Sequence, residues 1–431
     1  MLKVAQTAHD LSQQKEPLSP AAAEAIKETM DYSPWYIDAQ PSRMSRPLPM
    51  PWALGPVKDT RKSSMELLDL EIESFGRYAE LSPAEKVARE SVIVETNTFI
   101  SKTITKQMVE TNVFGSEKTG LATATSDIDF RLSWSSRSRQ NSSSALSGPL
   151  KHLAKAMSGS PEYEHVEFRF AKYPLIAAKH KKSGIDIQIV SSPDTRPQRD
   201  VTAQYLTELP HLRSVYMVVK TALSIRGLVD VYSGGTGSYG LFIMLVAALK
   251  RRSSDPPTTA AAQLLRFLDF YTHLNTEKHA ISVSQSKLFM KHDASEVPLK
   301  DNIEAARRRG DAIRAAQWAI GQKRLHQPYL LCLQDPAKPS NDLGRKSNAV
   351  KHIQRTLKVL YNTLQRDLED IQAAQNHGKP WQHDSILEPH VGRCHEVYFE
   401  RRRKVEEYGL KSMLETERTS KAGQRVAKEG A

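Results

Sequence analysis

The chain has 431 residues, more than one hydrophobic core normally organises, so we expect two or three domains. Lysine and arginine outnumber aspartate and glutamate by 61 to 49, and the net charge of +12 suits a polyanionic partner such as a nucleic acid. Two cysteines exclude a disulfide framework and a cysteine-ligated zinc site, and no apolar run approaches the ~20 residues that cross a bilayer. We therefore expect a reducing compartment and no membrane.

The N-terminal part of the chain predicts an extended arm followed by helices. Residues 1–62 contain a proline-rich stretch, and proline lacks the amide donor that regular structure needs. From about residue 64 to residue 106 the apolar spacing is helical. The segment SPAEK at 82–86 supplies a serine N-cap, a proline in the first turn and a glutamate three residues after the serine. These signals predict a helix start at that segment.

Strands are expected to dominate the next part of the chain. Short β-rich runs lie between residues 108 and 192, and an expected helix at 143–157 interrupts them. After Pro210 the spacing becomes mostly helical, and the run LFIMLVAAL at 241–249 predicts a buried helix. From about residue 399 the chain is rich in Glu, Lys and Arg, which predicts a solvated helix or a frayed tail.

Two aspartates two residues apart mark the first candidate site. In a strand over SDIDFRLSW, Asp127 and Asp129 share one face, while their neighbours point into a core. Like charges on one face favour a cation, although a bare Asp-X-Asp is also typical of an exposed edge strand. Gly115 and Ser116 follow the preceding strand and can offer amides and a hydroxyl to a phosphate. With a third strand carboxylate, Asp186, they predict a two-metal nucleotidyl-transfer site.

These motifs have a recognisable order. FGS followed by DID and a separate ID resembles the catalytic signature of the DNA polymerase β-type nucleotidyltransferase superfamily. Three later stretches resemble template-independent poly(A) and poly(U) RNA polymerases: the helix start GGTGSYGLFIMLVAALK, the PAP-associated segment AQLLRFLDFYTHLNTEKHAISV and the nucleotide recognition loop LQDPAKPSNDLGRKSNAV. The resemblance covers roughly residues 85–370, and four motifs in order are far more specific than one. The chain thus resembles this family, and mitochondrial poly(A) polymerases within it.

The resemblance implies an α+β fold. A nucleotidyltransferase palm with a mixed β-sheet and helices would pack against a mostly helical central domain that contains the PAP-associated segment. The implied segments are an extended arm over 1–62, a helical segment of the central domain over 63–97, the palm over 98–205, the central domain over 206–376 and a charged tail over 377–431.

The resemblance also implies roles for the candidate residues. Asp127 and Asp129 would bind both metal ions, Mg²⁺ or Mn²⁺, and Asp186 would complete the site facing the RNA 3′-hydroxyl. Gly115 and Ser116 would hold the β- and γ-phosphates of ATP. The other implied nucleotide-binding residues are Lys220 for the triphosphate, Ser238 and Tyr239 at a helix start, and Asp335 and Asn341 in the recognition loop. From the residues alone, an amphipathic helix, core packing and an ordinary turn explain these positions equally well.

Two departures from the family pattern affect substrate binding. Many relatives carry a second lysine one turn after the first, and this chain has Ser224 there. Residues 191–200 lack the Gly or Asn that approaches the ribose, so Gln198 or Arg199 would have to serve. RNA would be held by basic stretches at 179–182, 250–252 and 307–309, although each alone is more typical of a solvated surface.

The predicted function is Mg²⁺-dependent transfer of AMP from ATP to an RNA 3′-hydroxyl. Two alternatives stay open: an RNA uridylyltransferase, and a catalytically silent member that serves as an RNA-binding or scaffold subunit of a ribonucleoprotein complex such as a mitochondrial ribosome. The expected partners are a single-stranded RNA 3′ end, ATP and a possible ribonucleoprotein partner. SPWYIDAQPSR resembles segments that follow the presequence of some mitochondrial proteins, so we expect a mitochondrial protein, with nucleus or cytoplasm as alternatives.

Overall fold

The computed structural model describes most of the chain. The described residues are 34–39, 50–55, 62–104, 109–134, 146–170, 173–251, 257–293, 300–308, 311–324, 326–381, 383–392 and 396–429. Most of the predicted arm over 1–62 lies outside them, as do two residues of the predicted basic stretches, Arg252 and Arg309. Within the described part of the chain, every helix is too short or too polar to traverse a bilayer.

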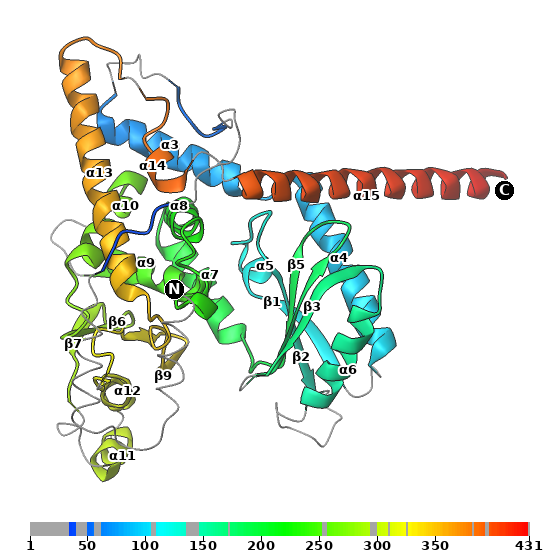
Figure 1. Ribbon diagram of the computed structural model, residues 1–431, viewed down its shortest axis with the longest axis horizontal. Helices are drawn as coiled ribbons and strands as arrows, with labels where there is room; N and C mark the ends of the chain where they lie inside the picture. Colours follow the sequence, from blue (N-terminus) through cyan, green and yellow to red (C-terminus); the bar gives the residue numbers. More distant parts are fainter. Residues whose placement is uncertain are drawn as a thin grey trace. The chain divides into compact units, whose positions relative to one another are not determined.

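Two compact units divide the chain (Figure 1). The palm unit comprises Ser42–Pro49, Arg77–Gln204 and Cys394–Ala431, and the helical unit comprises Met1–Pro41, Met50–Gly76 and Tyr205–Arg393. This division differs from the expected one at two places. The helix after Gly76, expected in the central domain, belongs to the palm unit, and so does the expected tail from residue 394 onward.

The palm unit is built on a five-stranded sheet with the strand order β1-β2-β5-β4-β3. Its strands are β1 Val109–Phe114, β2 Ile128–Trp134, β3 Tyr163–Arg169, β4 Leu175–His180 and β5 Asp186–Val190. β2 and β5 run parallel, whereas the other neighbouring strands run antiparallel. The predicted mixed sheet of an α+β fold is therefore confirmed.

Side-chain alternation gives this sheet one apolar face and one polar face. In β2, Ile128 and Phe130 are fully buried, and Asp129 between them is only half-buried. The apolar face packs against two helices, α4 Pro83–Thr103 and α6 Ser147–Ser158, in one hydrophobic core. Since successive strand residues point to opposite faces, the polar positions of β2 and β5 lie together on the side away from this core.

Helix α4 begins as the sequence predicts. The Ser82 hydroxyl accepts a hydrogen bond from the Glu85 amide at 3.2 Å, and the Ser82 amide donates to the Glu85 carboxylate at 2.7 Å. This reciprocal pair is a capping box with Pro83 in the first turn. Helical periodicity alone could not show that the buried face of α4 belongs to the palm core.

The C-terminal segment is a helix that packs on the palm. In α15 Glu396–Glu429, the Arg402 guanidinium pairs with the buried Glu85 carboxylate at 2.6 Å, and the Tyr408 hydroxyl donates to Glu95 at 2.6 Å. Gly409 lies directly against the backbone of Ala84 on α4. Figure 1 shows α15 crossing the upper end of α4 and continuing beyond it. The first part of α15 is thus a packed element of the palm unit.

The helical unit contains most of the remaining helices and a second sheet. Helices wholly inside it are α8 Leu212–Ser224, the 3-10 helix η2 Val231–Ser233, α9 Ser238–Lys250, α10 Ala260–His273, α11 Lys300–Arg308, α12 Ala312–Ile320, α13 Val350–Asn376 and α14 Glu388–Val391. Helices α3 Ser64–Ala79 and α7 Arg196–Glu208 contain residues at which the chain passes between the units. Residues 240–249 of α9 are all buried, as the apolar run predicts.

The second sheet was not expected from the sequence. Its strand order is β7-β6-β8-β9, with β6 His279–Ser282, β7 Lys287–Met290, β8 Leu333–Asp335 and β9 Lys338–Asp342. These strands are only three to five residues long. Such short runs show little periodicity, so the region resembled loops between helices.

We predict that Gly409→Ala destabilises the palm unit. Alanine favours a free helix over glycine by about 1 kcal/mol, but here its Cβ would lie 1.9 Å from the Ala84 carbonyl oxygen. We expect a net loss of about 1–3 kcal/mol in the free energy of unfolding, typical of overpacking, measured by denaturant titration. Glu406→Ala, on the exposed face of the same helix, is the matched control. A stabilised Gly409→Ala variant would contradict the close packing of Gly409 against Ala84.

Candidate active site

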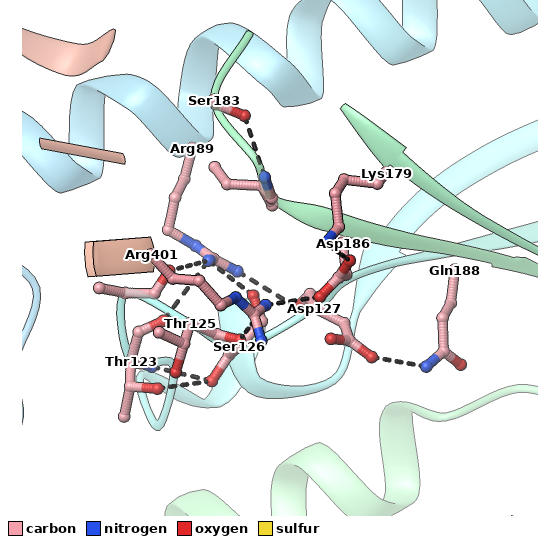
Figure 2. Close-up of polar contacts among 12 residues, drawn as sticks. Arg89, Thr123, Thr125, Ser126, Asp127, Lys179, Ser183, Asp186, Gln188 and Arg401 are labelled. Atoms are coloured by element: carbon pink, nitrogen blue, oxygen red, sulfur yellow. Dashed lines mark hydrogen bonds and ion pairs between the residues drawn. The ribbon is translucent and has the colours of Figure 1, made fainter. Parts of the chain in front are cut away.

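The three predicted metal-binding aspartates lie on the polar face of the palm sheet. Asp127 directly precedes β2, Asp129 is in β2, and Asp186 opens β5. The parallel pairing sets Ile128 opposite Ile187, so Asp127 and Asp186 come to the same end of adjacent strands. Figure 2 shows both side chains at this end of the sheet. The structure therefore brings together carboxylates that are 59 residues apart in the chain (186 − 127).

Gly115 places the predicted phosphate-binding turn beside Asp129. Gly115 has a φ of +66° and precedes the short helix α5 Ser116–Thr119. A Cβ at Gly115 would lie 2.2 Å from a carboxylate oxygen of Asp129. Both the positive φ and this close approach require glycine. The amides and hydroxyl expected to meet a phosphate thus adjoin the carboxylates expected to hold metal ions.

The surroundings of Asp127 disfavour the negative charge of its carboxylate. Burial chiefly, and the nearby Asp186 charge next, raise the pKa of Asp127. The Gln188 side-chain amide opposes this shift by donating to Asp127 at 2.6 Å. Gln188 follows Asp186 by two residues and so lies on the same face of β5. The period-2 pattern could have identified Gln188 from the sequence.

A buried arginine that sequence reasoning missed holds the loop before β2. The Arg89 guanidinium on α4 donates to the carbonyl oxygens of Ser126 at 2.7 Å and Asp127 at 3.2 Å (Figure 2). It also pairs with the Glu117 carboxylate of α5. The side chain is 1% exposed. One guanidinium therefore joins the phosphate-binding turn to the loop that carries Asp127. The sequence feature that could have identified Arg89 is its helical spacing from the other buried residues of α4.

Two cations face Asp186. Arg401 of α15 donates to one carboxylate oxygen at 2.5 Å and to the Thr125 carbonyl oxygen at 3.3 Å. Lys179, the register partner of Asp186 on β4, lies 3.6 Å from the other carboxylate oxygen. Nothing local in the sequence indicates Arg401, because it lies 215 residues after Asp186.

The donor set of this face fits a divalent cation. Carboxylate oxygens are the ligands that Mg²⁺ and Mn²⁺ prefer. The raised pKa of Asp127 means that its negative charge is costly until a cation compensates it. Across the described residues, no three acidic, histidine or cysteine side chains already converge as a ligand cluster. Asp127, Asp129 and Asp186 are the side chains of this face that would hold such an ion.

The predicted base-recognition residues form a second cluster, in the helical unit. The Tyr239 hydroxyl donates to Asp335 at 3.1 Å, and the Asn341 side-chain amide donates to the other oxygen of Asp335 at 3.0 Å. Asp335 is fully buried and also accepts from the Ala337 amide at 2.9 Å. Burial and the adjacent Asp335 raise the pKa of Tyr239, so its hydroxyl keeps the proton that it donates. Asn341 itself is exposed, which leaves it accessible to a ligand.

The remaining candidates lie at the starts and ends of helices. Ser238 opens α9, and its carbonyl oxygen accepts from the Tyr216 hydroxyl at 3.1 Å. The Lys220 ammonium lies 5.9 Å from the centre of the same tyrosine ring. Within the helical unit, Tyr216 therefore contacts two of the predicted nucleotide-binding residues, Ser238 and Lys220. Gln198 and Arg199, the expected ribose contacts, lie in the first turns of α7, where Arg199 pairs with Asp200.

Two family models match separate parts of the chain. Residues 68–192 match the model described as "Poly(A) RNA polymerase, mitochondrial-like, central palm domain", and residues 261–341 match "Cid1 family poly A polymerase". The resemblance to template-independent poly(A)/poly(U) RNA polymerases is confirmed. The first match includes the three aspartates and the Gly115 turn, and the second includes Asp335 and Asn341.

Curated relatives of this polymerase family differ in what their names state about activity. The chain is 26% identical over 326 residues to Poly(A) RNA polymerase CID14 of Cryptococcus neoformans, covering 73% of this chain and 38% of the relative. It is 26% identical over 295 residues to the Inactive non-canonical poly(A) RNA polymerase protein Trf4-2 of Drosophila melanogaster, covering 66% of this chain and 65% of the relative. In both cases the chain spans less than two thirds of the relative.

A solved polymerase structure confirms the fold class. The polymerase core of TRAMP, described as an RNA surveillance complex, aligns with a TM-score of 0.60 at 22% identity. The alignment covers 80% of this chain and 99% of that one. The α+β architecture of the chain is therefore that of a nucleotidyltransferase polymerase core.

We predict that Arg89→Met destabilises the palm unit strongly. The substitution leaves the Ser126 and Asp127 carbonyl oxygens and the Glu117 carboxylate without the guanidinium that binds them. Breaking a buried ion pair from one side costs about 3–5 kcal/mol, and denaturant unfolding measures this loss. Arg403→Met is the matched control, since Arg403 is 66% exposed and, within the described part of the chain, pairs with Glu407 of its own helix. Adding Glu117→Gln to Arg89→Met should recover part of the loss. Equal effects of the two arginine variants would contradict the anchoring role.

Proposed function

We propose that this chain is an RNA 3′-terminal adenylyltransferase that uses ATP and a divalent cation. The observation that carries the proposal is the polar face of the palm sheet. There Asp127, Asp129 and Asp186 lie on adjacent strands, next to the glycine turn at Gly115. Carboxylates beside a phosphate-binding turn suit nucleotidyl transfer because the reaction joins a triphosphate to a hydroxyl through metal-bridged oxygens.

The chain's own residues supply positioning and electrostatics in this reaction. The RNA 3′-oxygen attacks the α-phosphorus of ATP, a new phosphodiester bond forms, and the bond to the β-phosphate oxygen breaks, so that pyrophosphate leaves. A bound divalent cation would neutralise phosphate charge and lower the pKa of the 3′-hydroxyl. The three aspartates would hold that cation. The Gly115-Ser116 turn would orient the triphosphate, which suits a reaction that depends mainly on alignment.

The cluster around Asp335 supports adenine as the transferred base. Because the Asn341 amide nitrogen donates to Asp335, the Asn341 carbonyl oxygen is directed away from that carboxylate. This oxygen can accept a hydrogen bond from the exocyclic amine of adenine. Uracil carries a carbonyl oxygen in place of that amine, so of these two bases only adenine can donate an exocyclic N–H to this oxygen. Relatives that transfer UMP tend to have a histidine at the matching position, so Asn341 favours ATP over UTP.

A second candidate is a catalytically silent RNA-binding or scaffold subunit of a ribonucleoprotein complex. The observation that favours it is the pairing of Asp186 with Arg401 and Lys179, which occupies a predicted metal ligand with fixed positive charges. The relative Trf4-2, whose name describes it as inactive, is consistent with such a role.

We predict that the purified chain extends a labelled oligoribonucleotide with ATP in the presence of Mg²⁺ or Mn²⁺. Asp129→Ala should abolish this extension while the unfolding midpoint is kept or raised, because the variant removes a metal ligand and also a like charge. Product lengths on a denaturing gel, with each NTP supplied separately, measure the activity. Asp370→Ala, an exposed aspartate on α13, is the control and should extend normally.

The same assay distinguishes the alternatives. Extension with UTP in preference to ATP would support the uridylyltransferase. No extension with any nucleotide under either cation would support the silent subunit. Normal extension by Asp129→Ala would remove the carboxylate face from the proposal.

We predict that Asn341→His lowers the ratio of ATP use to UTP use. The histidine is bulkier and would lose the carbonyl acceptor that suits adenine. The wild-type preference for ATP should be about tenfold to two-hundredfold, the range of a single misplaced contact, and the variant should narrow or reverse it. The ratio of kcat/KM for the two nucleotides measures this. Ser340→His, at the neighbouring exposed position of β9, is the matched control. A ratio unchanged in Asn341→His would exclude Asn341 from base selection.

A further inference from the structure

Helix α15 brings a guanidinium into the carboxylate face from the far end of the chain. We propose that Arg401 competes with a divalent cation for Asp186, so that the C-terminal helix limits cation binding at the candidate site. This inference rests on the proposed function, since it takes Asp186 as a cation ligand. It adds a residue from outside both matched family regions, which end at residues 192 and 341.

The contact geometry sets Arg401 and a divalent metal ion in competition for the Asp186 carboxylate. Arg401 lies 2.5 Å from one carboxylate oxygen, and Lys179 lies 3.6 Å from the other (Figure 2). A metal ion on this carboxylate would share its two oxygens with these side chains, and it would be repelled by a guanidinium held at hydrogen-bond distance. Of the two side chains, Arg401 makes the shorter, charge-assisted hydrogen bond. Arg401 is therefore the main competitor.

The anchoring of α15 does not depend on Asp186. Arg402 pairs with Glu85 and donates to the Tyr78 carbonyl oxygen at 2.6 Å. Lys404 donates to the Lys181 carbonyl oxygen at 3.0 Å, and Tyr408 binds Glu95. These contacts hold the helix on α4 and on the turn after β4 without involving Arg401. Arg401 can consequently leave Asp186 by rotating its side chain while α15 stays on the palm.

The resting contact of Arg401 is incomplete. Among the described residues, its Nε is buried and makes no hydrogen bond. A buried donor left unpaired is unfavourable, which offsets part of the attraction of Arg401 to Asp186. Its side chain is also 34% exposed, so water can reach the guanidinium when it moves. Both features weaken the contact of Arg401 with Asp186 and make it easier for a divalent cation to displace.

The test is a Mn²⁺ titration of the full chain, followed by the electron paramagnetic resonance signal of free Mn²⁺. Arg401→Gln removes the competing charge, so we expect its affinity for Mn²⁺ to rise about fivefold to tenfold, the net equivalent of one ordinary intramolecular hydrogen bond, because the contact is partly exposed. Arg401→Lys keeps the charge on a compact ammonium that lacks the planar fork of the guanidinium, and it should lie between this variant and the wild type. Arg403→Gln changes an exposed arginine two residues along the same helix and should bind as the wild type does.

Asp186→Asn separates failure of this inference from failure of the proposed function. If Asp186→Asn weakens Mn²⁺ binding and Arg401→Gln strengthens it, the competition is supported. If Asp186→Asn weakens binding but Arg401→Gln equals the wild type or binds more weakly, the competition is wrong and the metal face stands. If Asp186→Asn binds Mn²⁺ like the wild type, Asp186 is not a ligand and the metal-site part of the proposed function fails with it. Thermal unfolding without metal confirms that each variant is folded.

Discussion

Repulsion between Asp127 and Asp186 is the constraint on which the arrangement of the palm unit depends. The parallel pairing of β2 with β5 brings the two carboxylates to the same end of adjacent strands, and alternation keeps them off the apolar face. Burial of Asp127 adds to the cost of its charge: burial first, and the Asp186 charge next, raise the pKa of Asp127. The surrounding polar groups answer this constraint: the Gln188 amide reaches Asp127, and Lys179 and Arg401 reach Asp186.

Helix α4 connects the loop that carries Asp127 to the C-terminal helix α15. Its buried side contributes Arg89, which binds the loop before β2, and Glu85, which binds Arg402 of α15. The same helix buries Ala88 and Val92 against the sheet. Loop, sheet and C-terminal helix therefore share one rigid support. Because a buried ion pair broken from one side is costly, a change in α4 would disturb both the Asp127 loop and the docking of α15.

Short sequence patterns predicted those elements that a few neighbouring residues determine. Alternation located the strands around Asp127 and Asp186, and the serine, proline and glutamate at 82–86 located the start of α4. Gly115 was identifiable because a strand followed by Gly-Ser is a compact motif. The short strands β6 to β9 were missed because three to five residues carry too little periodicity. Arg401 was missed because its contact with Asp186 depends on how α15 packs on α4, and no spacing rule reaches across 215 residues.

The position of α15 in the chain has a consequence for the order of synthesis. Residues 205–393 of the helical unit separate the sheet of the palm unit from its last helix. A ribosome that adds roughly 5–20 residues per second would take about ten to forty seconds over that stretch. During this interval the nascent palm holds Glu85 without Arg402, and Asp186 without Arg401. The sheet can form early, but its acidic face acquires Arg401 only after the helical unit has been translated.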